Sequence, residues 1–551
     1  MKVLGRAGKA SGTLANWVNV SDGTRSYSLD RASVTDWKEA SLPEDDLMSS
    51  VEYGETLVCL GSDMTEVEFE DAKAAELLKW QQFDVYDEVV DNGQCHLTGR
   101  WVCTKKYGPD GSENKARFVA KGFQESIEIP SDSPTGSKEC LRLMLLLVSS
   151  QEWVLHCLDV KSAFLQGKYL DRIVYLKPPF EAGTSGVLWK LKKCVYGLSD
   201  ASRKWYLALS EKLQSLGCQR SKFDYGMFHM RVANNLIGLL VMHVDDILWS
   251  GTAKFAELVI SPLCASFNIG KHAEKEFQYV GVHIAQDDSA IYVDQIEYLN
   301  EISAIDIAVK RRDQKSMPCS SEEATSFRRL VGMLNWVASQ TRPDLSFDVC
   351  RLSSCMGHPT VGDLFKANKV LGKIKQSPLK ITFPKLENFV DSKVIVHADA
   401  SLANLPNGKS VGGYVVFLGD TANMCGPIVW KSNTLKRVVR STLAAETCAA
   451  LEGLDAAFFI SKIASEMIGS SLPIVAFTDN RPLYKNVHST TMAHEYRLRI
   501  DLAAIKEMLI KQEVMSFSWV EKSKQLADCL TKFGASPLLL LSVLETGIMS
   551  V

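Results

Sequence analysis

The sequence lacks the patterns that mark disulfide frameworks, zinc sites and membrane proteins. None of its 14 cysteines belongs to a Cys-x-x-Cys pair, and cysteines scattered singly through apolar runs indicate reduced, buried thiols and no zinc-binding domain. No stretch approaches the roughly 18 uninterrupted apolar residues of a membrane span. The first residues also lack the apolar core of a signal peptide. We therefore expect neither a membrane partner nor secretion.

Charge is unevenly distributed along the 551 residues, although the net charge is only −3. Residues 30–91 contain 18 acidic and 4 basic residues, a local charge of −14, whereas residues 1–29 carry +3. The remaining residues 92–551 therefore carry +8. A basic body suits a polyanionic partner such as a nucleic acid, although this excess is slight by itself for so long a segment. Residues 1–92 are expected to form an acidic, partly ordered leader.

Hydrophobic patterning divides the rest of the chain into several domains. A chain of this length predicts three or four of them. Short strands mix with helices up to residue 293, residues 295–380 are mainly helical, and from residue 392 strands alternate with helices as in an α/β domain. The predicted strands are 96–105, 116–123, 153–160, 223–230, 235–243, 247–250, 277–284 and 290–293 (these two as a hairpin), 394–398, 412–418, 427–431, 474–477 and 514–520. The predicted helices include 138–150, 201–216, 441–465 and 491–511.

Two consecutive aspartates, Asp245 and Asp246, lie between two apolar strands. Phosphoryl transfer to a nucleotide uses two divalent cations about 4 Å apart, and magnesium prefers oxygen ligands such as carboxylates. A tight turn would place both carboxylates at one point, and Asp159, at the end of the predicted strand 153–160, is the candidate third ligand. A surface turn is the competing interpretation, but a plain surface hairpin rarely has two fully apolar arms.

Four further acids near the C-terminus form a second candidate site. They are Asp399 and Asp479 at the ends of predicted strands, Glu446 in a predicted helix, and Asp528 in a later short segment. Hydrolysis of a phosphodiester with two metal ions also requires carboxylates from separate elements. Singly, each acid is better explained as a cap or a surface charge; together they indicate a nuclease. His397, close to Asp399, is interpreted as a structural residue that faces away from the acids.

These acidic segments resemble the catalytic motifs of Pol polyproteins from copia-type long-terminal-repeat retrotransposons, in the portion that holds reverse transcriptase and ribonuclease H. Further segments match that family in the same order, over roughly residues 95–533. They are residues 115–122 of the fingers motif, Ser133-Pro134-Thr135, Tyr196-Gly197-Leu198 with Arg203 and Trp205-Tyr206, Leu330-Val331-Gly332, Thr341-Arg342-Pro343-Asp344, Asp479-Asn480 and the segment around Asp528. Coincidence is a poor explanation for so many motifs in the same order.

The resemblance implies a multidomain α/β and α+β fold, a right-hand polymerase followed by an RNase H-like α/β domain. Its domains would be fingers and palm at 93–290, thumb and connection at 291–390, the RNase H-like domain at 391–535 and a C-terminal tail at 536–551. It implies an RNA-directed DNA polymerase with RNA–DNA hybrid ribonuclease activity. The implied partners are an RNA template, a DNA primer, the hybrid, deoxynucleoside triphosphates, and the capsid and integrase of the same element. The expected location is a virus-like particle in the cytoplasm, or the nucleus.

The resemblance also assigns roles to individual residues. Each active site would hold two Mg²⁺ ions, with Mn²⁺ as a substitute. The metal ligands would be Asp159, Asp245 and Asp246 in the polymerase, and Asp399, Glu446, Asp479 and Asp528 in the nuclease. The nucleotide and template would contact Lys115, Arg117, Lys121, Phe164 and Gly197, and the primer would contact Val280, Gly281 and Val282. A solvated basic strand and an ordinary core phenylalanine are the alternatives for the basic residues and for Phe164.

The sequence departs from the family at two positions. His243 stands two residues before the aspartate pair, where the family usually has tyrosine, which concerns contacts to the primer and not the metal ligands. Ala444 stands where the family often has an acidic residue, while Glu446 is present. A catalytically decayed or co-opted protein that only binds nucleic acid is therefore the alternative function. A nuclease that uses the first half as a binding platform is a lesser alternative.

Overall fold

The computed structural model describes residues 2–6, 17–21, 26–30, 58–59, 66–108, 111–126, 128–405, 408–490 and 495–549. The chain divides into two units, residues 1–53 and residues 54–551. In the first unit, an antiparallel sheet in sequence order contains β1 (Lys2–Arg6), β2 (Trp17–Ser21) and β3 (Ser26–Asp30). Residues 7–16, 22–25, 31–57 and 60–65 of the predicted leader lie outside the described residues.

The fingers are built around three large aromatic rings. Their elements are β4 (Val58–Cys59), α1 (Glu70–Gln82), β5 (Tyr86–Val90), β6 (Gly99–Gly108), β7 (Gly111–Ala120), β9 (Tyr175–Leu176) and β10 (Val187–Leu191). The buried Trp80 ring lies 5.7 Å from that of Phe118 and 5.5 Å from that of Trp189, centroid to centroid. Residues 70–90, expected within the leader, thus pack into the fingers. The acidic composition concealed this, because the opposite face of α1 is exposed and charged.

A six-stranded sheet forms the palm. Its elements are α2 (Lys138–Ser150), β8 (Leu155–Val160), α3 (Ala201–Ser215), β11 (Gln219–Arg220), β12 (Met227–Val232), β13 (Asn235–His243), β14 (Asp246–Gly251), α4 (Ala253–Phe255), α5 (Ser261–Ser266) and β15 (Ile269–Glu274). The strand order is β11-β12-β13-β14-β8-β15. Val241 of β13 packs in the cluster of α2, whereas Met242, the next residue, packs in that of α3. Burial on both faces explains the unbroken apolar run of β13, and the predictions of this strand and of helix 138–150 are confirmed.

A four-stranded antiparallel sheet and a group of helices follow the palm. They are β16 (Glu276–Tyr279), β17 (Val282–Gln286), β18 (Ala290–Asp294), α6 (Ile296–Glu301), α7 (Ser321–Gln340), α8 (Ser346–Ser353), α9 (Val361–Gln376) and β19 (Ile381–Pro384). The prediction of one strand at 277–284 is wrong, because a tight turn divides it into β16 and β17. Val280 and Gly281 form this turn with φ angles of 46° and 71°. Valine rarely adopts a positive φ, so the apolar alternation concealed the turn.

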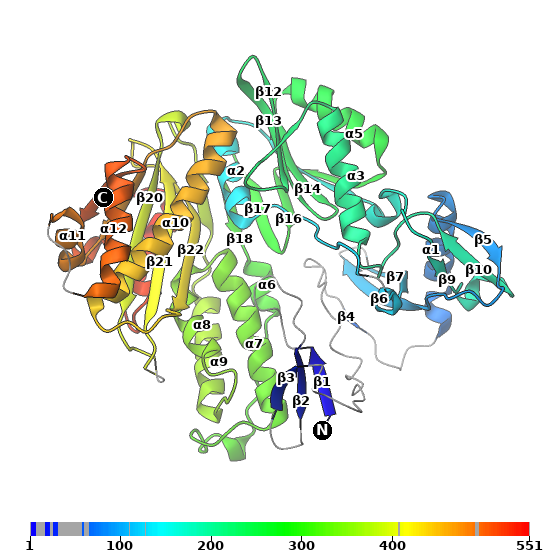
Figure 1. The fold of residues 1–551 in the computed structure, drawn as a ribbon, viewed down its shortest axis with the longest axis horizontal. Coiled ribbons are helices and arrows are strands. Elements are labelled where there is room, and N and C mark those ends of the chain that lie inside the picture. The colour runs from blue at the N-terminus through cyan, green and yellow to red at the C-terminus, as the bar shows by residue number, and fades with distance from the viewer. Residues whose placement is uncertain are drawn as a thin grey trace. The chain divides into compact units, whose positions relative to one another are not determined.

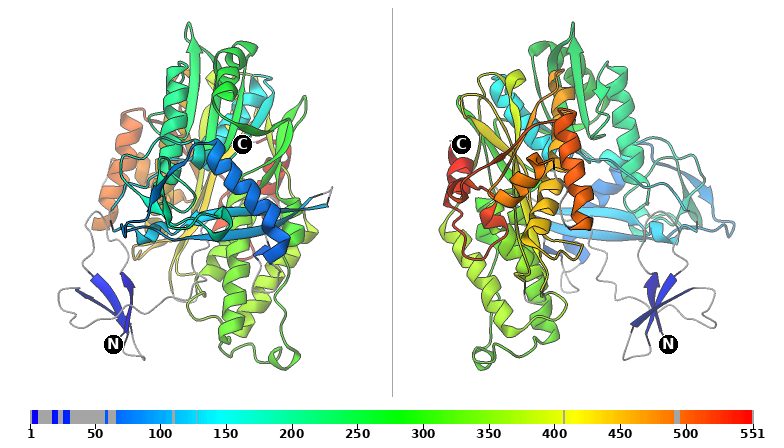
Figure 2. Two further views of the ribbon diagram at one scale, coloured as in Figure 1. Left: turned by 90° about the vertical axis from the view of Figure 1, so that its right-hand side faces the viewer. Right: turned by 60° about the vertical axis from the view of Figure 1, so that its left-hand side comes forward.

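The C-terminal part contains a five-stranded sheet. Its elements are β20 (Lys393–Ser401), β21 (Val411–Gly419), β22 (Cys425–Thr434), α10 (Thr442–Ile468), β23 (Ile474–Thr478), α11 (Arg481–His488), α12 (Tyr496–Ile510), β24 (Val514–Trp519) and α13 (Leu538–Thr546). The order is β22-β21-β20-β23-β24; β20, β21 and β22 are antiparallel, while β23 and β24 run parallel to β20. Helix α10 lies along this sheet (Figures 1 and 2). This is the predicted RNase H-like α/β arrangement.

Two helices of this part differ from the predictions. The helix expected at 491–511 begins at Tyr496, and residues 491–494 lie outside the described residues. Helix α11 was not predicted, because its eight residues offer a single buried i,i+4 apolar pair, Leu483 and Val487, which is too short a repeat to establish helical periodicity. Helix α13, in the expected C-terminal tail, buries Leu540, Val543 and Leu544 in the main hydrophobic core. In the described part of the chain, no helix combines the length and apolarity that crossing a bilayer requires.

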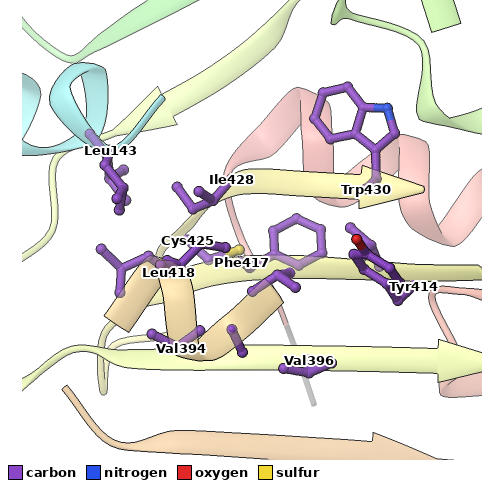
Figure 3. Packing of buried hydrophobic residues seen from close by; sticks show 14 of the residues in the cluster. Leu143, Val394, Val396, Tyr414, Phe417, Leu418, Cys425, Ile428 and Trp430 are labelled. Atoms are coloured by element: carbon purple, nitrogen blue, oxygen red, sulfur yellow. The ribbon is translucent and has the colours of Figure 1, made fainter. Parts of the chain in front are cut away.

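Helix α2 joins the palm to the five-stranded sheet β20–β24 of the candidate nuclease, named the nuclease sheet below. Nine of its thirteen residues are buried, Cys140 and Arg142–Ser149, and all of these except Arg142 and Ser149 are apolar, as expected of a helix buried on nearly every side. Leu146 lies so close to β22 that a Cβ atom added at Gly426 would meet it at 2.9 Å. Figure 3 shows Leu143 of α2 in the same cluster as Leu418 and Ile428 of the nuclease sheet. One hydrophobic core therefore extends from the palm through α2 into the RNase H-like domain.

Arg142 on α2 strengthens this junction. Its guanidinium donates hydrogen bonds to the carbonyl oxygens of Ile428 in β22 at 2.9 Å and Gln340 at the end of α7 at 3.0 Å. It also lies 3.8 Å from the ring centroid of Trp430. A buried cation is tolerated only when its donors are satisfied, so Arg142 requires the palm, α7 and β22 to be in place together.

The C-terminal end of α10 also contacts the palm. Arg231 of β12 donates hydrogen bonds to the carbonyl oxygens of Glu466 and Met467 in the last turn of α10. The Glu466 side chain accepts a hydrogen bond from the backbone N–H of Lys222 at 3.0 Å. A cation at a helix C-terminus interacts favourably with the helix dipole. The helix that carries Glu446 is therefore held both by its own sheet and by the palm.

Candidate active sites

The three candidate polymerase acids lie at one end of the palm sheet. Asp159 near the end of β8 pairs with Asp246 at the start of β14 in the antiparallel register. The carbonyl oxygen of Asp245 accepts a hydrogen bond from the N–H of Val160 at 3.0 Å. Strand pairing thus brings Asp159 to the aspartate pair from a distant segment of the chain, as the sequence predicts.

The turn that carries the aspartate pair is supported from α3. Val244 in this turn has a φ of 56°, a left-handed conformation that is strained for a β-branched residue. The indole Nε1 of the buried Trp205 donates a hydrogen bond to the Val244 carbonyl oxygen at 2.6 Å. Trp205 belongs to a motif that the sequence shares with the family, but its contact with the turn follows only from the tertiary structure. The indole keeps the aspartate pair at the sheet end.

Gly270 of β15, which sequence reasoning missed, lies against the Asp159 carboxylate. A Cβ atom at Gly270 would meet Oδ2 of Asp159 at 2.3 Å and Cγ of Lys161 at 2.9 Å. Both distances are shorter than carbon atoms tolerate, so any larger residue must displace the carboxylate. The requirement for glycine therefore comes from the candidate active site and not from a positive φ.

Gly270→Ala is expected to lower the kcat/KM of primer extension roughly 10- to 100-fold, because displacement of a catalytic group by about 1 Å has effects of this size. RNA cleavage, measured on the same preparation, is expected to be unchanged. Gly372→Ala in α9 is the matched control, since a Cβ atom there meets no heavy atom within 4 Å. Full primer extension by Gly270→Ala would show that the Asp159 position tolerates the shift.

The predicted nucleotide-binding residues lie on the fingers hairpin and beside it. Along β7 the side chains of Ala116, Phe118 and Ala120 are buried, which puts Lys115 and Arg117 on the opposite face. The Arg117 guanidinium lies 5.4 Å from the ring centroid of Tyr196. Lys115 forms an ion pair with Glu113 at 3.2 Å, and the partly exposed Lys121 follows at the end of the strand.

Phe164 and Gly197 lie between the fingers and the palm. The half-buried Phe164 ring packs edge-on against Tyr196, with centroids 5.4 Å apart. Gly197 has a φ of 93°, and a Cβ atom there would meet the Ala120 carbonyl oxygen at 2.0 Å. Close approach of the fingers strand β7 therefore requires this glycine, whereas its predicted contact with a nucleotide stays a prediction. Burial raises the pKa of Tyr196 to about 12, so its hydroxyl stays protonated.

The residues predicted to contact the primer form the turn between β16 and β17. The Gly281 carbonyl oxygen accepts a hydrogen bond from Gln295 Nε2 at 3.0 Å. Val282 is only 3 % exposed and packs in the core, so its contact with the primer stays a prediction. The neighbouring Tyr279 donates a hydrogen bond to the Val241 carbonyl oxygen at 3.4 Å, which ties this hairpin to β13.

His243 lies at the end of β13 and pairs with Asp246 in the register. It is half-buried, and burial lowers the pKa of its imidazole below the usual value. The ring is therefore neutral at neutral pH. It adds no positive charge beside the aspartate pair.

Three of the four candidate nuclease acids converge. Each of Asp399, Glu446 and Asp479 offers one ligand atom, and these atoms all lie within 4.8 Å of one another. The parallel pairing of His397 with Phe477 makes Asp399 and Asp479 emerge together, two residues further along β20 and β23. Glu446 comes from the start of α10, which packs on β20. The sequence predicted these three acids as ligands, and the sheet brings them together.

Asp528, the fourth predicted ligand, lies outside this group. Lys532 Nζ is 2.9 Å from Oδ1 of Asp399 and also contacts Oδ1 of Asp528. The Thr531 hydroxyl donates a hydrogen bond to Oδ2 of Asp399. Asp528 therefore joins the site through a lysine, whose role the sequence did not reveal.

The nuclease acids fit a divalent cation. Burial, reinforced by the negative charges of Asp399 and Asp479, raises the pKa of Glu446 to about 9. Burial also raises the pKa of Asp399 to about 6, despite Lys532. Oε2 of Glu446 is buried and has no hydrogen-bond partner among the described residues. An all-oxygen donor set with an unpaired buried atom suits a hard cation such as Mg²⁺ or Mn²⁺.

Without divalent ions, the protein is expected to lose stability as the pH rises from about 4.5 to about 9. Glu446 has a pKa of about 9 in the folded chain against 4.5 ordinarily, so unfolding releases a proton in this range and becomes easier at higher pH. Calorimetry in chelator should show a fall in Tm of about 5 °C or more between these limits. Glu446→Gln removes the titrating group, so its Tm should depend less on pH; an equal dependence would contradict the assignment.

His397 faces the same side of β20 as Asp399, which corrects the prediction, because residues two apart in a strand share a face. The buried ring stacks on Phe477 at 5.0 Å, and its Nδ1 lies 3.2 Å from Oε1 of Gln525. Gln525 in turn donates a hydrogen bond to the Ala398 carbonyl oxygen at 3.0 Å. Burial lowers the pKa of His397 to about 4, so the ring is neutral. These contacts agree with a structural role.

A palm sheet with three aspartates at one end, followed by an RNase H-like sheet with converging acids, agrees with the predicted fold of a right-hand polymerase joined to an RNase H-like domain. Residues 83–318 match the family described as reverse transcriptase (RNA-dependent DNA polymerase). The chain is 29% identical over 459 residues to the retrovirus-related Pol polyprotein from transposon RE1 of Arabidopsis thaliana, covering 79% of this chain and 30% of the relative. It is 27% identical over 478 residues to the retrovirus-related Pol polyprotein from transposon TNT 1-94 of Nicotiana tabacum, covering 80% of this chain and 35% of that relative.

The solved structure of the foamy viral protease–reverse transcriptase in complex with an RNA/DNA hybrid has a similar fold. Its TM-score is 0.51 at 11% sequence identity, covering 86% of this chain and 56% of that chain. The chain spans about a third of the length of the curated relatives it matches. It is similar to copia-type Pol polyproteins, and residues 83–318 match the reverse transcriptase family, as its motifs predict.

Proposed function

We propose that this chain copies RNA into DNA and then cleaves the RNA strand of the resulting hybrid. The observation that carries the proposal is the pairing of Asp159 with Asp246 beside Asp245, on a sheet buried on both faces. Carboxylates from two distant segments meet there at a strand end, which is where an acidic site for nucleotide transfer is needed. The family match supports the same activity.

In the polymerase, Asp159, Asp245 and Asp246 would hold Mg²⁺ ions, whose chemistry is to stabilise the attacking and leaving oxygens of phosphoryl transfer. The chain itself supplies position and charge. Trp205 holds the aspartate turn, and Arg117 presents a cation on the face of the hairpin opposite the core. Positive groups there offset the negative charge of a triphosphate.

In the nuclease, Asp399, Glu446 and Asp479 would hold Mg²⁺ between two strand ends and one helix. Burial keeps competing water away from Asp399 and Glu446, which strengthens their attraction for a cation. Lys532 and Thr531 orient the Asp399 carboxylate through its two oxygens. A hybrid strand held by its phosphates is the substrate that such a site suits.

The proposed substrates are an RNA template with a DNA primer, deoxynucleoside triphosphates and an RNA–DNA hybrid. The solved structure with a similar fold was obtained in complex with an RNA/DNA hybrid. The relatives are Pol polyproteins of transposons, so we propose the capsid and integrase of the same element as protein partners. The proposed location is a virus-like particle in the cytoplasm, or the nucleus.

The test uses the purified chain in two assays with Mg²⁺. One supplies an RNA template, an annealed DNA primer and deoxynucleotides; the other supplies a labelled RNA–DNA hybrid. Primer extension together with RNA cleavage is the expected result. Cleavage alone would identify a nuclease with a binding platform, and hybrid binding with neither activity would identify a nucleic-acid-binding protein. Either outcome would overturn the proposed polymerase activity.

A further inference from the structure

The ammonium group of Lys532 lies between two acids of the nuclease site. Its Nζ is 2.9 Å from Oδ1 of Asp399 and 2.5 Å from Oδ1 of Asp528. The second oxygen of Asp399 accepts a hydrogen bond from Thr531. The Asp399 side chain is fully buried, so both of its oxygens take their partners from residues 531–532 and not from solvent.

The four predicted metal ligands therefore fall into two sets. Asp399, Glu446 and Asp479 converge, and Asp528 is not part of that group. On the side of Glu446, the buried Oε2 has no hydrogen-bond partner among the described residues, which leaves a place for a divalent cation. On the side of Asp528, Lys532 already supplies the positive charge.

We propose that Lys532 takes the place of a second divalent cation, so that the nuclease site binds one ion readily and a second only when Lys532 withdraws. The proposal rests on the proposed function in one respect, that these acids bind divalent ions. An ammonium group and a hard cation compete here, because both need the facing oxygens of Asp399 and Asp528.

Lysine is suited to this exchange. Its charge lies on a flexible four-carbon stem, and the Lys532 side chain is 30% exposed, so it can turn toward solvent without a change in the backbone. Arginine, with a planar fork, would leave the carboxylates less easily. Lys532 is thus a positioning residue that controls the occupancy of the site, and it forms no contact with the scissile bond in this role.

The test counts bound Mn²⁺ by electron paramagnetic resonance at neutral pH. The full chain carries Asp245→Asn and Asp246→Asn, so that bound Mn²⁺ reports on the nuclease site. With Lys532 present, one tightly bound ion and one weak ion are expected. Lys532→Met keeps the apolar stem and removes the charge, so the second ion should bind roughly tenfold more tightly or better. Lys532→Arg should keep the second ion weak.

Two controls separate the possible failures. Lys524→Met removes an exposed lysine from the same C-terminal segment and should leave both affinities unchanged. Asp479→Asn should abolish tight binding of the first ion; if it does not, the proposed nuclease site is wrong. Two ions of equal affinity with Lys532 present, or the same weak second ion in Lys532→Met, would overturn the role of Lys532 alone. If Lys532→Met does not fold, Lys532→Gln provides the same comparison.

Discussion

Primer extension is expected to fall by roughly 1,000-fold or more when Asp245 is replaced by asparagine. The three aspartates are expected to bind the metal ions as one unit, so removal of one carboxylate should cost nearly as much as removal of all three. Asparagine keeps the shape of the side chain but removes the charge that attracts Mg²⁺. The hydrogen bond from Val160 to the carbonyl oxygen of residue 245 is a backbone contact and remains. The Tm should therefore change little.

The measurement is single-turnover extension of a DNA primer on an RNA template. Asp288→Asn, an exposed acid in the loop between β17 and β18, is the control for loss of one negative charge. RNA cleavage in a preformed hybrid should be the same in Asp245→Asn and in the unmodified chain. Normal extension by Asp245→Asn would remove the aspartate pair from the mechanism.

RNA cleavage is expected to show the second large effect, with a loss of roughly 1,000-fold or more in Asp479→Asn. Asp479 is one of three acids whose ligand atoms lie within 4.8 Å, so its loss leaves two carboxylates for the cation. The Asp479 carbonyl oxygen accepts a hydrogen bond from Trp519 at 3.0 Å, and this backbone contact is kept. Loss of a neighbouring negative charge should also lower the pKa of Glu446 toward its ordinary value.

This prediction is checked with a labelled RNA–DNA hybrid, and primer extension on the same samples reports on the polymerase. Asp455→Asn is the matched control, since Asp455 is an exposed acid on α10, the helix that carries Glu446. Loss of primer extension alone in Asp245→Asn, together with loss of RNA cleavage alone in Asp479→Asn, would establish two independent sites. If one substitution abolished both activities, the chain would instead depend on a single site.

Sequence reasoning worked best where burial controls the pattern. Strand β13 has apolar side chains on both faces, and helix α2 is buried on nearly every side, so both appear as unbroken apolar runs. It failed where the backbone departs from common conformations, as at Val280 in the turn between β16 and β17. Sequence reasoning also failed to place residues 70–90 in the fingers. Most charges of helix α1 in this segment lie on its exposed face, while Trp80 on the other face is buried.

The candidate sites were predictable only in part. A carboxylate at the end of an apolar strand is visible in the sequence, and this rule identified Asp159, Asp399 and Asp479. Which acids converge depends on strand register, and Asp528, outside the converging group, is linked to Asp399 only through Lys532, a contact that the sequence does not reveal. The fit of Gly270 against Asp159 is likewise a contact between strands, and no spacing along the chain reveals it.

The burial of α2 has a consequence for how the protein is made. The helix ends at Ser150, but β22, which covers it, begins only at Cys425. At about 5–20 residues per second, a ribosome needs tens of seconds to add the intervening segment. During that time the newly made palm presents an uncovered leucine-rich helix, a surface that invites association with chaperones or with other unfinished chains. A polymerase half released by early termination would keep that surface permanently, so its solubility depends on synthesis reaching the nuclease sheet.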